Sequence, residues 1–288
     1  MISLQTNVTS LFAQEQLSLN SNFESKTIQQ LTSGFRINSS GDDAAGLAVA
    51  NQLQANVAEL QQGVINASNG TSILQIIDGG LNNIANLLDR LQTLATESAS
   101  GTFAGNRTTL NNEFQSVLTE ITRQAGNIGL ATGGTTSNTG TIGSSQYNTT
   151  ALAIFIGGGD TGTATDNQVS VDLTNGGNGV DVTGLGLTGA AVDTAGNATT
   201  ALGTIQTAIS NLGTVQGAVG SGENLLNYAT NLANSQVTNL TAAESSIKDA
   251  DIAAEAANLA KAQTLQQSSI AALAQANAMP AALLKLLQ

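Results

Sequence analysis

The stretch LTSGFRINSSGDDAAGLAVANQL, residues 31–53, contains the break that decides how this chain folds. An apolar pattern typical of a helix stops at Gly34, a polar loop follows, and a long run rich in Ala and Leu begins after Asp42 and Asp43. The two carboxylates could form a catalytic or metal site, or they could start a helix. A paired acid/base site needs a partner that separates the two pKa values, and the sequence offers none. We therefore interpret the loop as a joint between two long helices.

The two acids suit the first turn of the second helix. Ser40 is expected to cap that helix, and Asp43, three residues later, takes the place of the acid in a capping box. Asp42 and Asp43 would then face the positive end of the helix dipole, which acids stabilise.

The composition excludes several classes of function. The chain has 288 residues, a net charge of −12, only 3% aromatic residues, and no His, Cys or Trp. Acidic surfaces are repelled by nucleic acid and by anionic membranes. Without His and Cys, the commonest general base, the commonest metal ligands and any disulfide are missing. We expect no enzyme activity, no metal and no cofactor.

No segment of the sequence predicts membrane insertion or a cleaved leader. No apolar run approaches the ~20 residues that cross a bilayer. The N-terminal residues lack the basic and apolar regions of a signal peptide. The Gly-, Thr-, Asn- and Ala-rich composition nevertheless resembles that of secreted bacterial surface proteins.

The apolar pattern divides the chain into five segments. Residues 1–41 contain a terminal helix and the loop, 42–130 and 201–250 are two halves of a helical core, 131–200 are Gly/Thr-rich, and 251–288 form a last helix interrupted near Pro280. Alternating spacings of three and four predict a coiled-coil stripe at Ala50, Leu53, Val57, Leu60, Val64, Ala67, Thr71 and Leu74, which resumes at Leu81, Ile84, Leu88, Leu91 and Ala95 after a slip in register at Gly79 and Gly80.

The C-terminal half repeats the same kind of pattern. The predicted stripe there comprises Leu202, Ile205, Ile209, Leu212, Leu225, Leu232, Leu240 and Ile247, and a shorter helix is expected at 107–125. Alternation in ALAIFIGGG (151–159) and NQVSVDL (167–173) predicts short strands. The expected fold is mainly α: an antiparallel coiled coil or helical bundle, with a small β region capping its outer end.

The two extremities carry thin apolar stripes, which are Leu4, Val8 and Leu11 at one end and Ile252, Leu259 and Leu273 at the other. Such helices bury too little apolar surface to offset the entropy of ordering the chain. We infer that they fold only against each other or against other copies.

Three stretches together resemble bacterial flagellin, the filament subunit. LQTNVTSL (4–11) is similar to the family's opening Ile-Asn-Thr-Asn-x-x-Ser/Ala-Leu, and residues 31–46 to its Leu-Ser-Ser-Gly-x-Arg-Ile-Asn-x-x-x-Asp-Asp-Ala-Ala-Gly. The final 43 residues before Gln288 are similar to the family's closing block, including Gln275-Ala276-Asn277. Gln5, Ser246 and Lys248 depart from the family pattern. The resemblance covers both helical terminal zones, roughly two-thirds of the chain.

The resemblance implies a self-assembling subunit of the extracellular flagellar filament, with its terminal helices at the inner wall. It further implies type III export without a cleaved signal, and an export chaperone, a filament cap and hook–filament junction proteins as partners. The loop becomes the spoke between inner and outer helices: Gly34, Gly41 and Asn38 suit a bend, and Arg36 is expected to contact acids nearby.

The resemblance also implies a host partner. Arg90, Leu94 and Glu113 correspond to flagellin residues that matter for Toll-like receptor five, although Gln92 and Thr93 replace a common Arg-Glu pair. Two other functions stay open on the sequence: a hook–filament junction protein, and a secreted adhesin whose Gly/Thr-rich middle binds glycans.

Overall fold

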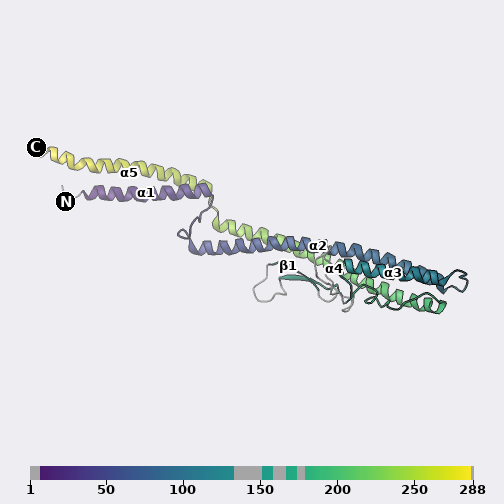
Figure 1. Cartoon of the computed structure of the whole chain (residues 1–288). Coiled ribbons are helices and arrows are strands. Elements are labelled where there is room, and N and C mark those ends of the chain that lie inside the picture. The colour runs from purple at the N-terminus through teal and green to yellow at the C-terminus, as the bar shows by residue number, and fades with distance from the viewer. Residues whose placement is uncertain (1–6, 133–150, 158–166, 174–178, 287–288) are drawn as a thin grey trace. The chain divides into compact units, whose positions relative to one another are not determined.

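The computed structural model describes residues 7–132, 151–157, 167–173 and 179–286, with side chains as far as Met279. Its elements are α1 (Val8–Ser33), α2 (Ala44–Ala99), α3 (Arg107–Asn127), β1 (Leu152–Phe155), β2 (Gln168–Val171), α4 (Ala195–Lys248) and α5 (Ile252–Leu286) (Figure 1). The mainly helical fold expected from the sequence is confirmed. The chain forms two compact units: residues 1–57 with 238–288, which we call the terminal unit, and residues 58–237, which we call the central unit.

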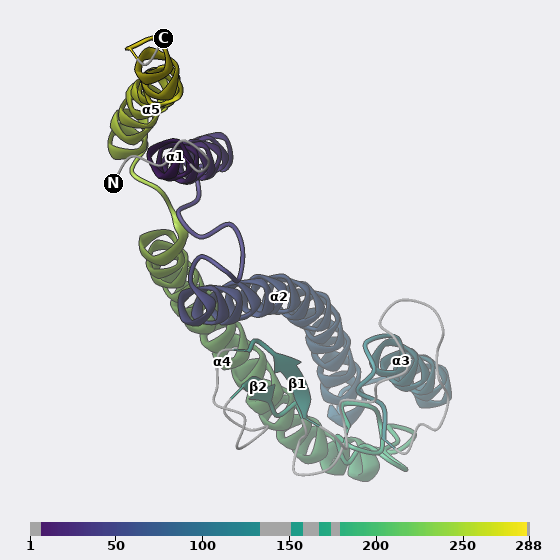
Figure 2. The same cartoon turned by 90° about the vertical axis from the view of Figure 1, so that its left-hand side faces the viewer.

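In the terminal unit, α1 and α5 run antiparallel, side by side (Figures 1 and 2). The Asn20 side-chain amide donates to the Ser269 hydroxyl at 2.7 Å, and the Ser10 hydroxyl donates to the Asn277 side chain, also at 2.7 Å. Polar contacts thus lie at two levels of this helix pair. Ala and Leu, which are strong helix formers, dominate α5, whereas α1 combines Leu and Gln with many serines, which are weaker helix formers.

The last helix continues through Pro280 to Leu286, so the interruption predicted there is wrong. A proline inside a helix cannot donate to the carbonyl four residues earlier, here that of Ala276. The Asn7 side-chain amide donates to this carbonyl at 2.8 Å, while its oxygen accepts from the Ser10 N–H at 3.1 Å and so caps α1. One asparagine therefore starts one helix and satisfies the acceptor that the proline leaves free in the other.

In the central unit, α2 and α4 run antiparallel. A Cβ atom at Gly70 would meet Leu226, a Cβ atom at Gly222 would meet Leu74, and Gln216 donates to Asn82 at 3.3 Å. From Leu60 to Ser98 a buried stripe of α2 keeps steps of three and four without the expected slip, with Gly80 and Leu94 buried beside it: Leu60, Gly63, Ala67, Gly70, Leu74, Ile77, Leu81, Ile84, Leu88, Leu91, Ala95 and Ser98. Gly63 and Gly70 replace Val64 and Thr71, which are half-buried.

The α4 stripe also differs from the predicted one. Its buried members are mostly small: Ala198, Ala201, Ile205, Ala208, Leu212, Val215, Val219, Gly222, Leu226 and Ala233. Ile209, Leu225 and Leu232, which we expected in the core, are at least 36% exposed. The prediction favoured the largest apolar residues, whereas small residues let the elements packed on α4 come close.

The two strands form an antiparallel hairpin that pairs Leu152 with Val171 and Phe155 with Gln168. Both predicted strands are therefore confirmed. The hairpin lies along α2 and α4 near the middle of these helices, and Figure 2 shows it between them. The expected position at the outer end is wrong. Two glycines of α2 allow the hairpin to pack this closely against the helix. A Cβ at Gly63 would overlap the carbonyl of Ile156, and one at Gly70 would overlap the Ile154 side chain.

The third helix packs antiparallel to the distal half of α2. A Cβ at Gly80 would overlap Ile128, and Arg90 pairs with Glu113. Turns follow residue 179, where the buried Asp181 carboxylate accepts from the Thr132 hydroxyl at 2.6 Å and from the Gly184 N–H at 2.8 Å.

Candidate functional site

The loop between α1 and α2 is fastened to the connection between α4 and α5. Gly34 ends α1 with a left-handed φ of 75°, a conformation that favours glycine, and its carbonyl accepts from the Ala250 N–H at 2.9 Å. Phe35 forms an antiparallel bridge with Asp249, and the Lys248 ammonium lies 4.5 Å from the centre of the Phe35 ring. The α1–α2 loop and the α4–α5 connection are therefore held together by these contacts.

Arg36 ends α4 instead of contacting an acid, so that expectation is wrong. Its guanidinium donates to the Ile247 carbonyl at 2.8 Å and its backbone N–H donates to the Lys248 carbonyl at 2.7 Å. The last carbonyls of a helix have no partner within the helix and carry partial negative charge, so a guanidinium stabilises them. Gln30 in turn donates to the Arg36 carbonyl at 2.8 Å.

The cation that meets an acid in this loop is Lys26. Its ammonium lies 2.8 Å from the Asp42 carboxylate, which also accepts from the backbone N–H groups of Asn38 and Ser39 at 3.2 and 3.0 Å. Lys26, followed by these two N–H groups, lowers the pKa of Asp42 from its ordinary 3.8 to about 2. Asp42 therefore folds the loop back on itself and ties it to α1.

Asp43, and not Ser40, caps α2. The Asp43 carboxylate accepts from the Gly46 N–H at 2.8 Å, and the helix begins at Ala44. Ser40 lies exposed in the preceding turn. Because α2 begins at Ala44, the acids precede the helix instead of occupying its first turn, and Asp43 accepts from the N–H of the third helical residue as an N-cap does. No group of His, Cys, Asp or Glu that could hold a metal occurs anywhere in the described ranges.

The α1–α5 pair buries small and polar residues and exposes its large apolar ones. Within the described part of the pair, Thr27, Ala262 and Ala276 are buried. The facing sides carry Ala13, Leu17, Asn20, Glu24, Thr27 and Leu31 on α1, and Asn258, Leu259, Ala262, Gln266, Ser269, Leu273 and Ala276 on α5. We expected apolar stripes to pair within one subunit, and only Leu259 and Leu273, both half-buried, follow that expectation.

Away from these facing sides, large apolar side chains of both helices are exposed. Val8 is 69% exposed, Leu11 60% and Ile252 50%, so these three residues do not join α1 to α5. Leu4 lies outside the described residues. Further large side chains share this exposure: Phe12, Leu19, Phe23, Ile28, Leu265, Ile270 and Met279. Apolar faces of this extent on a water-facing helix pair mark an interaction surface.

Arg90, Leu94 and Glu113 lie close together in the central unit. The Arg90 guanidinium makes hydrogen bonds of 2.9 and 2.5 Å to one Glu113 carboxylate oxygen, joining α2 to α3. Both side chains are about half exposed, at 53% and 45%. Leu94 is only 1% exposed, so it cannot contact a partner directly, and that part of the expectation is wrong.

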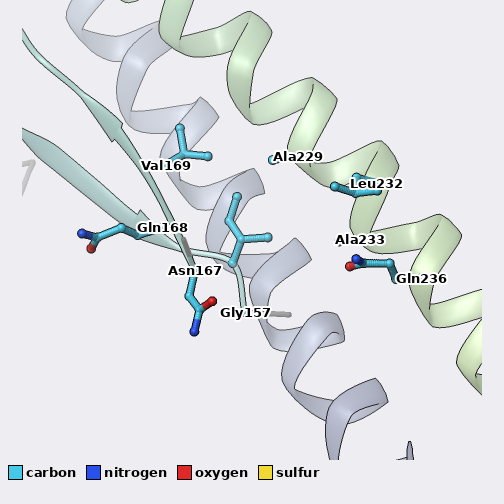
Figure 3. A pocket seen from close by; sticks show the side chains of 9 residues that line it. Gly157, Asn167, Gln168, Val169, Ala229, Leu232, Ala233 and Gln236 are labelled. Atoms are coloured by element: carbon cyan, nitrogen blue, oxygen red, sulfur yellow. The ribbon is translucent and has the colours of Figure 1, made fainter. Parts of the chain in front are cut away.

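A small pocket of about 140 Å³ lies between the hairpin and α4 in the central unit (Figure 3). It is lined by Ile156, Gly157, Asn167, Gln168, Val169, Ala229, Leu232, Ala233 and Gln236. None of these residues has an acidic, basic or nucleophilic side chain, so the pocket offers no catalytic group. The buried side-chain oxygen of Asn167 has no hydrogen-bond partner among the described atoms. A water molecule could supply the missing donor.

Both ends of the chain match family models of known proteins. The bacterial flagellin N-terminal helical region matches residues 4–128, and the bacterial flagellin C-terminal helical region matches residues 202–287. The chain belongs to the bacterial flagellin family. A flagellin of Halalkalibacterium halodurans is 31% identical over 285 residues and one of Listeria monocytogenes is 32% identical over 298, covering 98% and 99% of both chains. The crystal structure of Bacillus cereus flagellin is 25% identical, with a TM-score of 0.44, and covers 64% of this chain and 94% of that one.

As a flagellin, the chain is a structural subunit that polymerises with identical copies into the flagellar filament, an extracellular component of motility. It is not an enzyme. The findings favour neither the hook–filament junction protein nor the adhesin. In the described part of the chain no helix is long and apolar enough to cross a membrane.

Several residues of this flagellin were missed on the sequence. Asn7 and Lys26 act through partners 269 and 16 positions away, which no local pattern reveals. Gly63 and Gly70 could have been found, because they are spaced by one heptad and occur between the predicted core residues.

Proposed function

We propose that the exposed apolar faces of α1 and α5 are the polymerisation surface of this flagellin, and that the terminal helices gain their stability when neighbouring copies cover them. The single observation that carries the proposal is the inverted distribution of side chains: small and polar residues between the helices, large apolar residues outside. Of the assembly residues expected from the sequence, Val8, Leu11 and Ile252 lie on this surface. Leu259 and Leu273 face α1 within the subunit, and Leu4 lies outside the described residues.

The energetics support this coupling. Ordering a backbone residue costs about 1–2 kcal/mol, and burying one large apolar side chain returns about 1.5–3 kcal/mol. Within the described part of the α1–α5 pair, no large apolar side chain is fully buried. Burial against other copies supplies the missing term, so polymerisation and folding of the ends are linked by mass action.

Seeded growth tests the proposal. Purified chain added to filament fragments is expected to lengthen them under electron microscopy, whereas Val8→Ser and Leu11→Ser together abolish growth and leave the circular dichroism of the central unit unchanged. The matched control is Ser18→Ala with Ser21→Ala, which alters α1 without removing an apolar side chain and is expected to polymerise. Normal growth of the Val8/Leu11 variant would contradict the proposed surface.

We also propose that this flagellin leaves the cell unfolded through a type III channel without a cleaved signal, and that an export chaperone covers its terminal helices until then. The filament cap and the hook–filament junction proteins would meet the same helices at the two ends of the filament. The exposed apolar residues support this, because an uncovered surface of this kind aggregates. Mass spectrometry of secreted protein that begins at residue 1 or 2 would agree with it, and a shortened N-terminus would contradict it.

The spoke loop, comprising Gly34, Arg36, Asn38, Ser40, Asp42 and Asp43, is proposed to set the angle at which the terminal helices leave the core segments 42–130 and 201–250. The segments 1–41 and 251–288 then form the inner tube, and 131–200 the variable region. Valine strains the left-handed backbone of Gly34, so Gly34→Val filaments are expected to differ in diameter from wild-type filaments under electron microscopy. Unchanged filaments would contradict it.

We propose that Toll-like receptor five recognises the exposed Arg90–Glu113 pair. The buried Leu94 would act indirectly, by packing α2 in the core of the central unit. The half-exposed ion pair supports this proposal. Arg90→Ala and Glu113→Ala are expected to weaken binding to the receptor ectodomain, with Asp89→Ala as a neighbouring control. Unchanged binding of both variants would contradict it.

A further inference from the structure

The exposed apolar side of α1 carries one acid in its middle. Val8, Phe12, Glu15, Leu19 and Phe23 recur at steps of three and four and are all exposed. Residues at these steps lie on one side of a helix. The next charged residue on that side, Lys26, already pairs with Asp42. Glu15 has no hydrogen bond or ion pair to any residue that the structure describes.

An exposed side of α5 carries one basic residue, Lys261, which also has no described partner. Lys261 shares one exposed side of α5 with Leu265, Ala272 and Met279, which follow at four, eleven and eighteen residues, and with the polar Ser268 and Gln275. Of the cations whose side chains are described, which end at Met279, Lys261 is the one without a hydrogen bond, ion pair or ring contact. Each terminal helix thus has, on an exposed side that carries large apolar side chains, a charge without a described partner, and the two charges have opposite signs.

The two charges cannot meet within one subunit. Asn20 contacts Ser269, so Glu15, five residues earlier, lies level with about residue 274 of the antiparallel α5. Lys261 is about 13 residues further along α5, which is roughly 20 Å at a rise of 1.5 Å per residue. Glu24 lies nearer in level but belongs to the side of α1 that faces α5, and it forms no ion pair with Lys261.

We propose that Glu15 of one copy pairs with Lys261 of a neighbouring copy, and that this pair fixes the axial stagger between the two subunits at about 20 Å. The inference rests on the proposed polymerisation surface. An apolar face alone tolerates sliding, since apolar contacts are not directional. A charge buried without a partner is strongly unfavourable, so the two helices fit in the register that joins Glu15 to Lys261, and other registers are excluded.

Charge reversal tests the pair between copies. Glu15→Lys alone and Lys261→Glu alone place like charges together, and each is expected to raise the critical concentration for seeded growth about tenfold or more. The double variant Glu15→Lys/Lys261→Glu restores growth, and so does an equimolar mixture of the two single variants. Glu97→Lys in the central unit changes the net charge equally and serves as the control. Single variants that grow as wild type, or a double variant and a mixture that both fail, would overturn the pairing.

Cysteine cross-linking gives a second readout, because the chain contains no cysteine. Filaments of Glu15→Cys/Lys261→Cys are expected to give a ladder of disulfide-linked oligomers on mild oxidation, and the dilute monomer no internal disulfide. Asn22→Cys/Lys261→Cys moves one thiol two turns along the same helix and is expected to give little ladder. Equal ladders would overturn the stagger. If wild-type chain itself fails to polymerise, the proposed polymerisation surface fails, which is a different result.

Discussion

At the scale of single residues, Gly63 shows how an absent side chain positions an element far away in sequence. It lies on the buried stripe of α2, and a Cβ there would overlap the backbone carbonyl of Ile156, directly after β1. Gly79 on the same helix has open space around its Cα. Two glycines on one helix therefore have different physical roles.

The two glycines are expected to respond to alanine with opposite signs. Gly63→Ala displaces the hairpin and lowers the free energy of unfolding by about 1–3 kcal/mol, as overpacking does. Gly79→Ala raises it by up to about 1 kcal/mol, because alanine is the better helix former. Urea denaturation followed by circular dichroism measures both. Two changes of the same sign would show that the hairpin does not depend on this close approach.

Asp42 makes the spoke loop sensitive to acid. Its pKa of about 2 in the folded protein is below the 3.8 of the unfolded chain, chiefly because of Lys26. A lowered carboxyl pKa contributes stability that is complete above the unfolded value and is lost as the pH falls through the folded value. We therefore expect the loop to loosen between about pH 4 and pH 2.

The expected measurement is a carboxyl carbon NMR titration of Asp42 in Lys26→Met. Without the ammonium, the Asp42 pKa moves up towards 3.8. Glu120, whose pKa of about 2 is due chiefly to Arg123, is the internal control and stays unchanged. An unmoved Asp42 would assign its low pKa to the Asn38 and Ser39 N–H groups instead.

At the scale of elements, α5 depends on a side chain of α1 for one of its own hydrogen bonds. Pro280 has no N–H, and Asn7 donates to Ala276 in its place. The start of α1 is thereby joined to a late turn of α5, in a helix pair that has little apolar burial.

A double-mutant cycle isolates this bond. Asn7→Asp keeps a capping oxygen for α1 but loses the donor, and is expected to destabilise the pair by about 1–3 kcal/mol, because the Ala276 carbonyl is left unpaired. In a Pro280→Ala background the helix supplies its own N–H, so the same change costs much less. Amide hydrogen exchange of α1 in filaments measures both. Equal losses in the two backgrounds would contradict the compensation.

At the scale of the whole molecule, apolar burial is concentrated in the central unit. Most fully buried large side chains lie there, from Leu60 to Leu226, whereas the buried residues of the α1–α5 pair are small. We therefore expect the central unit to be stable in a single chain, and the proposed polymerisation surface predicts that the terminal pair gains its stability from other copies.

Limited proteolysis is expected to reveal this difference. In dilute monomer, cleavage concentrates in α1 and α5 and leaves a resistant fragment containing the central unit, because exposed and weakly packed helices open readily. In filaments the same helices resist cleavage. Mass spectrometry of the fragments checks both, and protease-resistant ends in the monomer would contradict the coupling of folding to assembly.

The sequence by itself determined the helices, the joint after Gly34, both strands and the family, because these depend on local spacing, on turn residues and on contiguous motifs. Only the tertiary structure decided that Asp43 caps α2, that Arg36 ends α4, that Gly63 and Gly70 belong to the core, and that Val8 and Leu11 face outward. Each of these depends on which surface meets which, and a periodic pattern cannot state that. In the described α1–α5 pair, small residues lie between the helices and large ones outside, which reverses the usual rule of burial and supports the proposal that another copy of the chain covers the outer side.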